Sequence, residues 1–133
     1  MKFFVLLIVS IPLILWKQCS DDPDDCMCTE EFRMYLVVVV DTLGNPVDSL
    51  QTTIKNEQGK EYNFGEFEPT PYSQGAYSVM TDGYEGDFRS GSKKIFFRGT
   101  KEGKQVTGEF EFKTDKCLCH VYKIAGPDTL VLK

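Results

Sequence analysis

Residues 26–41 read Cys-Met-Cys-Thr-Glu-Glu-Phe-Arg-Met-Tyr-Leu-Val-Val-Val-Val-Asp, and this stretch decides the fold. Side chains alternate between the two faces of a strand, so apolar residues of one parity predict a core-facing surface. Those residues are Phe32, Met34, Leu36, Val38 and Val40. The residues between them, Tyr35, Val37 and Val39, make the opposite face partly apolar too. We therefore expect a first strand that is covered on both sides.

Short runs with strand propensity continue along the rest of the chain, separated by turns rich in Gly, Pro, Asn and Asp. Residues 105–114 alternate most cleanly, with Val106, Phe110 and Phe112 on one face and polar residues on the other. That pattern is typical of a half-buried antiparallel strand. The further predicted strands are 47–55, 61–68, 76–81, 93–100, 117–125 and 129–133. Seven or eight strands at this spacing predict an all-β, antiparallel immunoglobulin-like β-sandwich.

Two Cys-x-Cys pairs lie near the ends of this region, Cys26 with Cys28 and Cys117 with Cys119. Residues i and i+2 of a strand share a face, and the first and last strands of sandwiches are commonly neighbours. Two disulfides between the pairs are therefore expected in an oxidising compartment. Parallel strands would join Cys26 to Cys117 and Cys28 to Cys119. Antiparallel strands would join Cys26 to Cys119 and Cys28 to Cys117.

A metal site is the alternative use of these four cysteines, with His120 adjacent to them. Soft sulfur ligands favour Zn²⁺ or Cu(I), which would make this a metal-handling envelope protein. An extended Cys-x-Cys, however, points both sulfurs the same way rather than around an ion. His120 has the opposite parity to Cys119 and is expected on a face of the sandwich. We therefore expect disulfides, with no metal and no cofactor.

The first eighteen residues have the character of a signal peptide. Lys2 is basic, and Phe3–Trp16 is an apolar block of 14 residues. A membrane-spanning helix needs about 20 such residues, so residues 1–18 fit a signal peptide better.

The segment that follows, Cys19-Ser20-Asp21-Asp22-Pro23-Asp24-Asp25, resembles the start of mature surface lipoproteins of Bacteroidetes-type bacteria. The resemblance implies lipidation of Cys19 and an acidic export signal. We therefore expect a tether over residues 19–29, followed by the sandwich domain that the strand pattern predicts over residues 30–133. Five cysteines are an odd number, and assigning Cys19 to a lipid leaves two pairs. Plain secretion and an uncleaved anchor are the alternatives, because Trp16-Lys17-Gln18 stands where lipoproteins usually carry small residues.

Two further motifs resemble carboxypeptidase regulatory-like domains, which have a transthyretin-like sandwich. Residues 37–47, Val-Val-Val-Val-Asp-Thr-Leu-Gly-Asn-Pro-Val, are similar to their opening V-x-V-x-D-x-x-G-x-P-V. Residues 75–79, Gly-Ala-Tyr-Ser-Val, are similar to their later G-x-Y-x-V strand. The resemblance extends loosely over residues 34–133. It implies a fold and a passive structural or binding role, and it carries over no catalytic residue.

The net charge and the missing catalytic motifs argue against two classes of function, nucleic-acid binding and catalysis. Removing Lys2 and Lys17 from the 15 basic residues leaves 13 against 20 acidic ones, a net charge of −7 for a chain that starts at Cys19. Such a chain has no electrostatic reason to bind nucleic acid. With a single His and no nucleophile-elbow motif, we expect no enzyme, although a hydrolase built from carboxylates is a third alternative.

A binding surface is expected on the longest irregular connection, through Phe67, Pro69, Pro71 and Tyr72, because binding residues concentrate on loops of rigid sandwiches. The acidic loop 82–87 offers oxygen ligands for Ca²⁺ but lacks EF-hand spacing. The expected protein is a non-enzymatic outer-membrane lipoprotein of the bacterial cell envelope, exposed at the surface. It would be held to the membrane by its lipid and would meet an unknown protein or glycan.

Overall fold

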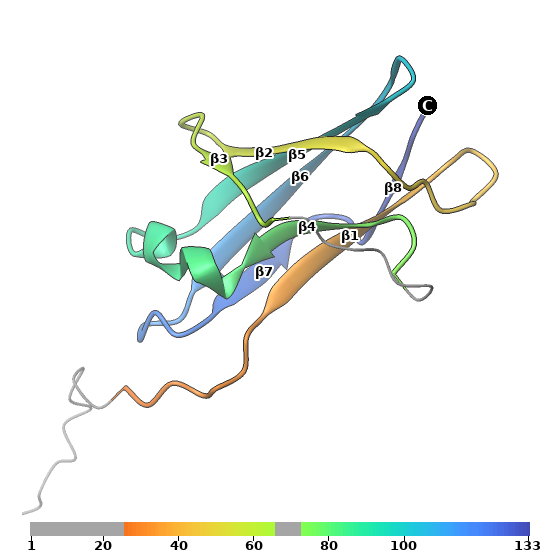
Figure 1. Ribbon diagram of the computed structural model, residues 1–133. Helices are drawn as coiled ribbons and strands as arrows, with labels where there is room; N and C mark the ends of the chain where they lie inside the picture. The colour runs from red at the N-terminus through yellow and green to blue at the C-terminus, as the bar shows by residue number, and fades with distance from the viewer. Residues whose placement is uncertain (1–25, 66–72) are drawn as a thin grey trace, which may run out of the picture.

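The computed structural model describes residues 26–65 and 73–133, which form two facing β-sheets (Figure 1). The smaller sheet has the order β4-β1-β8, and the larger one has the order β3-β2-β5-β6-β7. All pairings are antiparallel except β1 with β8, which is parallel. The elements are β1 (Met34–Val40), β2 (Gln51–Asn56), β3 (Glu61–Tyr62), β4 (Ala76–Thr81), the 3₁₀ helix η1 (Asp82–Phe88), β5 (Lys93–Lys101), β6 (Lys104–Thr114), β7 (Val121–Ala125) and β8 (Thr129–Val131). The predicted all-β sandwich is confirmed.

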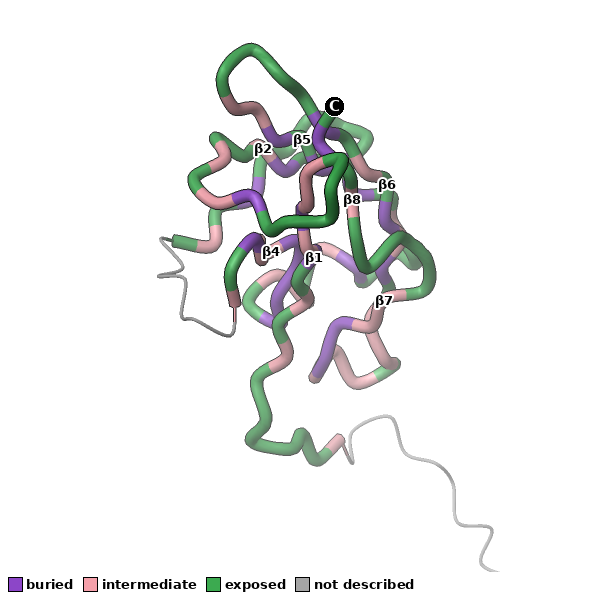
Figure 2. Tube along the Cα trace, turned by 90° about the vertical axis from the view of Figure 1, so that its right-hand side faces the viewer, coloured by how far each residue is buried: buried purple, intermediate pink, exposed green. Residues whose placement is uncertain are grey.

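The core lies between the two sheets, where Figure 2 shows the buried segments together. Alternate residues of β5 and β6 supply its aromatic centre, with Phe97, Phe110 and Phe112 at most 1% exposed. The polar residues between them face solvent, as the alternation in residues 105–114 predicts. The closely matched β5–β6 register, from Lys93 opposite Phe112 to Lys101 opposite Lys104, holds these rings in place.

The predicted core face of the first strand is wrong. Val37 and Val39 are fully buried, whereas Leu36, of the opposite parity, is 37% exposed. The strand is apolar on both faces, so parity alone could not choose between them. Tyr35 packs edge-on against Phe112 of the other sheet with ring centroids 5.3 Å apart, on the same inward side as Val37 and Val39.

The last strand, β8, pairs with β1. The two strands expected to carry the cysteine pairs are not neighbours, because β7 lies in the other sheet from β1. Cys26 and Cys28 lie in an extended segment before β1, and Cys117 and Cys119 lie in the turn between β6 and β7. That turn is closed by Leu118 at φ 55°, so the second Cys-x-Cys is not part of a strand as predicted.

Candidate functional site

Both expected disulfides are present, and their connectivity is the first of the two alternatives. Cys26 is bonded to Cys117 and Cys28 to Cys119, with Cα–Cα distances of 5.5 and 5.3 Å. We call these two bonds the disulfide clasp. The clasp holds the segment that precedes β1 against the β6–β7 turn at one end of the sandwich.

His120 is buried beside the clasp, so its expected place on a face of the sandwich is wrong. Only 5% of the residue is exposed. Its Nδ1 atom lies 2.7 Å from Oδ2 of Asp82, and its Nε2 atom lies 2.7 Å from the hydroxyl of Thr29. Thr29 follows the clasp directly, so the imidazole connects the clasp to the interior.

The carboxylate of Asp82 is the centre of a hydrogen-bonded cluster, which we call the Asp82 hub. Its other members are the side chains of His120 and Thr29 and the backbone N–H groups of Arg33 and Val121. Asp82 Oδ1 accepts the backbone N–H of Val121 at 2.7 Å, and Oδ2 accepts that of Arg33 at 2.8 Å. Burial acts to raise the pKa of Asp82, but the hydrogen bonds from His120, Val121 and Arg33 outweigh it and lower the pKa. Such bonds favour the ionised form. The hub therefore holds an anionic carboxylate between β1, η1 and β7.

The hub has the order hydroxyl, imidazole and carboxylate that occurs in Ser-His-Asp hydrolases. Here the two carboxylate oxygens of Asp82 also accept backbone N–H groups from two separate segments. The hub therefore holds these segments together. The acidic loop that could have held Ca²⁺ is likewise engaged, because Asp82 belongs to the hub and Asp87 pairs with Lys60 at 2.5 Å. Within residues 26–65 and 73–133, no group of three or more His, Cys, Asp or Glu side chains is placed to hold a metal ion.

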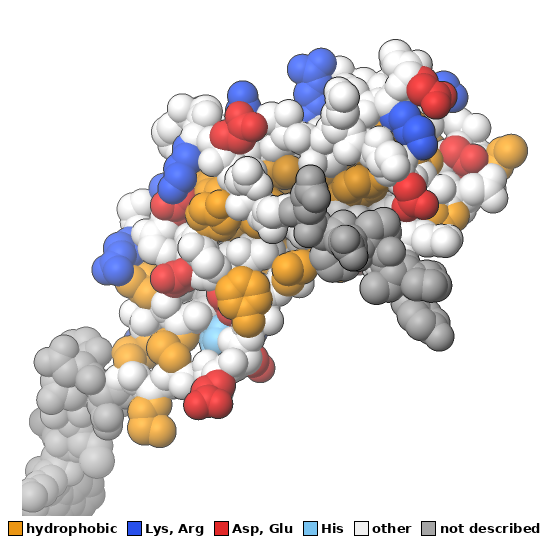
Figure 3. All heavy atoms as spheres, in the orientation of Figure 1, with side chains coloured by type: hydrophobic (Ala, Val, Ile, Leu, Met, Phe, Trp, Pro, Cys, Tyr) orange, Lys and Arg blue, Asp and Glu red, His pale blue; other side chains and the backbone are white. Residues whose placement is uncertain are grey.

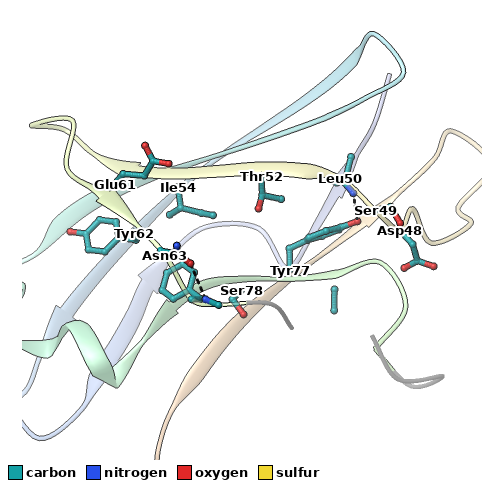
Figure 4. A pocket seen from close by; sticks show the side chains of 13 residues that line it. Asp48, Ser49, Leu50, Thr52, Ile54, Glu61, Tyr62, Asn63, Tyr77 and Ser78 are labelled. Atoms are coloured by element: carbon teal, nitrogen blue, oxygen red, sulfur yellow. Dashed lines mark hydrogen bonds between the residues drawn. The ribbon is translucent and has the colours of Figure 1, made fainter. Parts of the chain in front are cut away.

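A groove of about 630 Å³ lies on the side of the sandwich, between an edge of each sheet (Figure 4). One wall is formed by β2 and β3, the other by β4, and the segment before β2 closes one end. Its lining is mixed, with aromatic, hydroxyl, amide and carboxylate side chains. The lining residues are Asp48, Ser49, Leu50, Thr52, Ile54, Glu61, Tyr62, Asn63, Phe64, Gly65, Ala76, Tyr77 and Ser78.

Hydrogen bonds make the closed end of the groove rigid. The hydroxyl of Tyr77 donates to the carbonyl of Val47 at 2.6 Å and accepts the N–H of Leu50 at 3.1 Å. Burial raises the pKa of Tyr77, so the phenol stays protonated and can make both bonds. Asp48 Oδ1 accepts the N–H of Gly75 at 2.7 Å, which ties the segment before β2 to the start of β4.

Aromatic packing supports the other end of the groove. The ring centroid of Tyr84 lies 4.9 Å from that of Tyr62 and 5.6 Å from that of Phe64, both edge-on. The hydroxyl of Tyr84 donates to the carbonyl of Asn63 at 2.6 Å, which holds the chain beyond β3 in place. Burial and the nearby carboxylate of Asp87 raise the pKa of Tyr62 to about 12. This end is therefore shaped before any ligand arrives.

The wall formed by β4 has an open backbone edge. The N–H of Val39 donates to the carbonyl of Gly75, so odd-numbered residues of β1 face β4. Tyr77, the partner of Val37, faces back toward β1. Backbone groups alternate along an antiparallel ladder, so the N–H and C=O of Ser78 point away from β1. Since β4 ends the order β4-β1-β8, no strand among residues 26–65 and 73–133 pairs with this edge.

The residues singled out from sequence as a contact loop, Phe67, Pro69, Pro71 and Tyr72, lie outside the described residues, as does Cys19. The groove itself was missed. Tyr77 belongs to the G-x-Y-x-V motif, but only the fold shows that it stands opposite β2 across the groove.

Comparisons with known proteins give no relative for this chain: no family model, curated protein or solved structure matches it. Among the described residues, no helix has the length and apolar character needed to cross a membrane.

Proposed function

We propose that this protein is a non-enzymatic surface lipoprotein of a Bacteroidetes-type outer membrane, anchored through Cys19, whose groove binds an extended segment of a partner protein. The observation that carries the binding role is the groove between two sheet edges, one of which, β4, pairs with no further strand among residues 26–65 and 73–133. A carboxypeptidase regulatory-like origin accords with the two-sheet fold and with an accessory role.

An extended polypeptide suits this groove better than other ligands do. Edge strands offer a row of backbone donors and acceptors, and peptides often bind by adding a strand to such an edge. On β4, the N–H and C=O of Ser78 are directed outward for this purpose. Tyr77 and Phe64 provide apolar surface for alternate side chains of the peptide.

Charge indicates which peptides fit. Asp48 and Glu61 line the groove, and none of the described residues that line it is Lys or Arg. The chain from Cys19 carries a net charge of −7. A segment with basic residues would be attracted to this surface, and the attraction would weaken as salt screens it.

The test uses peptides selected from a random library of extended sequences displayed on phage, with the full-length protein in detergent as bait. Affinities of the selected peptides are then measured by calorimetry for wild type, Ser78→Pro and Ser78→Ala. Proline removes the outward N–H and is tolerated on edge strands. Ser78→Ala keeps that N–H and is the matched control.

We expect Ser78→Pro to lose most of the affinity, Ser78→Ala to keep it, and the selected sequences to be enriched in Lys and Arg. Peptides that bind both variants as tightly as wild type would show that the β4 edge is not the site. Binding confined to oligosaccharides on a glycan array would reassign the groove to a glycan and overturn the peptide assignment.

A further inference from the structure

Apolar side chains face solvent along β1 and the segment before it, and three of them, Phe32, Met34 and Leu36, were expected in the core. Leu36 is 37% exposed, Met34 42%, Phe32 64% and Met27 90%. Exposure thus rises steadily toward the N-terminal end of the described chain. We call these four residues the apolar stripe. Figure 3 shows hydrophobic side chains at the surface near the end where the N-terminal segment leaves the sandwich.

The buried face of β1 fixes the position of the apolar stripe on the opposite face. Val37 and Val39, on the buried face, are fully buried and fix the orientation of the strand. Because Leu36 and Met34 share the opposite parity, they cannot turn inward without exposing those valines. The stripe is therefore a permanent surface, and an exposed apolar surface of this kind usually marks a contact with something else.

Charge around the stripe is largely balanced. The guanidinium of Arg33 pairs with the carboxylate of Glu31 and lies 4.5 Å from the ring centroid of Tyr122. Of the three charged residues that flank Phe32, namely Glu30, Glu31 and Arg33, two are paired, which leaves a net charge of −1. A neutral partner surface suits such a patch better than a strongly charged one.

The chain that precedes the described residues indicates which surface this is. Twenty-five residues come before Cys26, among them the apolar block Phe3–Trp16 and Cys19. Only six residues separate Cys19 from Cys26. The seven steps from one Cα atom to the next reach about 25 Å in a fully extended chain. The bond from Cys26 to Cys117 fixes where this chain joins the sandwich, at the most exposed end of the stripe.

We infer that the apolar stripe rests on the lipid surface that holds the anchor, as a second membrane contact beside the acyl chains. The inference depends on the anchoring at Cys19 that the proposed function includes. Phe32 and Met27 would enter the interface first, being nearest to the anchor and most exposed. None of the stripe residues lines the groove, but Leu36 lies opposite Ser78 of the groove wall in the β1–β4 ladder.

Depth-dependent quenching of tryptophan fluorescence tests this contact. The only tryptophan, Trp16, lies in the predicted signal peptide and is absent from a chain that starts at Cys19, so Phe32→Trp carries a single fluorophore. The lipidated protein is reconstituted in phosphatidylcholine vesicles that contain brominated or spin-labelled lipid. Leu43→Trp is the control, because Leu43 is 85% exposed in the turn beyond the other end of β1. Both positions are exposed enough to accept the larger ring.

We expect lipid to quench Phe32→Trp several-fold more strongly than Leu43→Trp. If the protein floats with the vesicles but lipid quenches the two variants equally, the stripe does not contact the membrane. That result would overturn the inference and would be consistent with the anchor at Cys19. Protein that does not float with the vesicles would contradict the anchor itself, and with it the stripe contact. A Phe32→Trp emission that shifts with protein concentration rather than with lipid would assign the stripe to a second copy of the chain and overturn the inference.

Discussion

The Nδ1 atom of His120 lies 2.7 Å from Oδ2 of Asp82, and this contact connects the disulfide clasp to the interior of the sandwich. Asp82 begins η1 at the end of β4, while His120 precedes β7 in the other sheet. The contact therefore spans the two sheets at the end of the molecule where the N-terminal chain arrives. Thr29, on the other side of the imidazole, extends the connection to the clasp.

The first prediction concerns Asp82→Asn. The amide would place an N–H₂ where one carboxylate oxygen now accepts hydrogen bonds, leaving buried donors without acceptors. An unsatisfied buried polar group costs about 1–3 kcal/mol, so we expect a loss of about 2–4 kcal/mol in the free energy of unfolding. Urea titration at neutral pH measures it. Asp128→Asn, whose side chain is 89% exposed, is the control and should change stability by less than about 0.5 kcal/mol. Equal small effects of both variants would show that the hub contributes no stability.

The second prediction concerns pH. The pKa of Asp82 is lowered in the folded protein from its ordinary value of 3.8, so the unfolded chain binds this proton more readily. The stability that the carboxylate provides is therefore complete above the unfolded pKa and is lost as the pH falls through the lower folded pKa. Urea titrations between pH 7 and pH 2 should show the difference between wild type and Asp82→Asn shrinking only at acidic pH, below about 4. A difference that stays constant across the range would contradict this linkage.

The sequence predicted the orientation of a strand only where one of its two faces is apolar. The alternation in residues 105–114 predicted β6 and its buried aromatic face, because only one parity is apolar there. In β1 both parities are apolar, so the inward face is evident only from contacts between distant residues, such as that of Tyr35 with Phe112. The two disulfides followed from cysteine number and spacing, but the choice between the two pairings needed coordinates.

The candidate sites were harder to predict for the same reason. Asp82 was noticed only as part of an acidic loop, and nothing local indicates that its carboxylate meets His120, 38 residues away. The groove depends on which strands lie at sheet edges, and strand order is not encoded in any one stretch. Tyr77 and Leu50 come together there through a hydrogen bond between separate loops and strands.

The third prediction concerns the two disulfides. Each bond joins residues 91 apart, and closing a loop of that size contributes about 4–5 kcal/mol in the chain-entropy model. Once one bond has formed, the second closes little additional loop. Replacing Cys28 and Cys119 by Ala should therefore cost far less than replacing all four cysteines. Thermal unfolding of the two variants compares them, and equal losses would contradict the redundancy.

The fourth prediction concerns Gly75, which precedes β4. Its φ of +69° disfavours other residues, and a Cβ there would lie 2.7 Å from the carbonyl oxygen of Val39. Gly59 also has a positive φ, +82°, but a Cβ there would meet open space. Gly59→Ala should cost about 1 kcal/mol from backbone conformation alone, and Gly75→Ala about 2–3 kcal/mol or more. Equal costs in urea unfolding would show that the close approach to Val39 is relieved without strain.

The central claim is that the two Cys-x-Cys pairs clasp the sandwich to a chain whose remaining cysteine carries the membrane anchor. The intact mass of the protein, extracted from its native envelope without reductant and followed by peptide mapping, tests it most directly. The account predicts a chain that starts at Cys19 with the added mass of acyl groups, no free thiol, and cross-linked peptides that join Cys26 to Cys117 and Cys28 to Cys119. An unmodified Cys19, or free thiols among the other four cysteines, would contradict it.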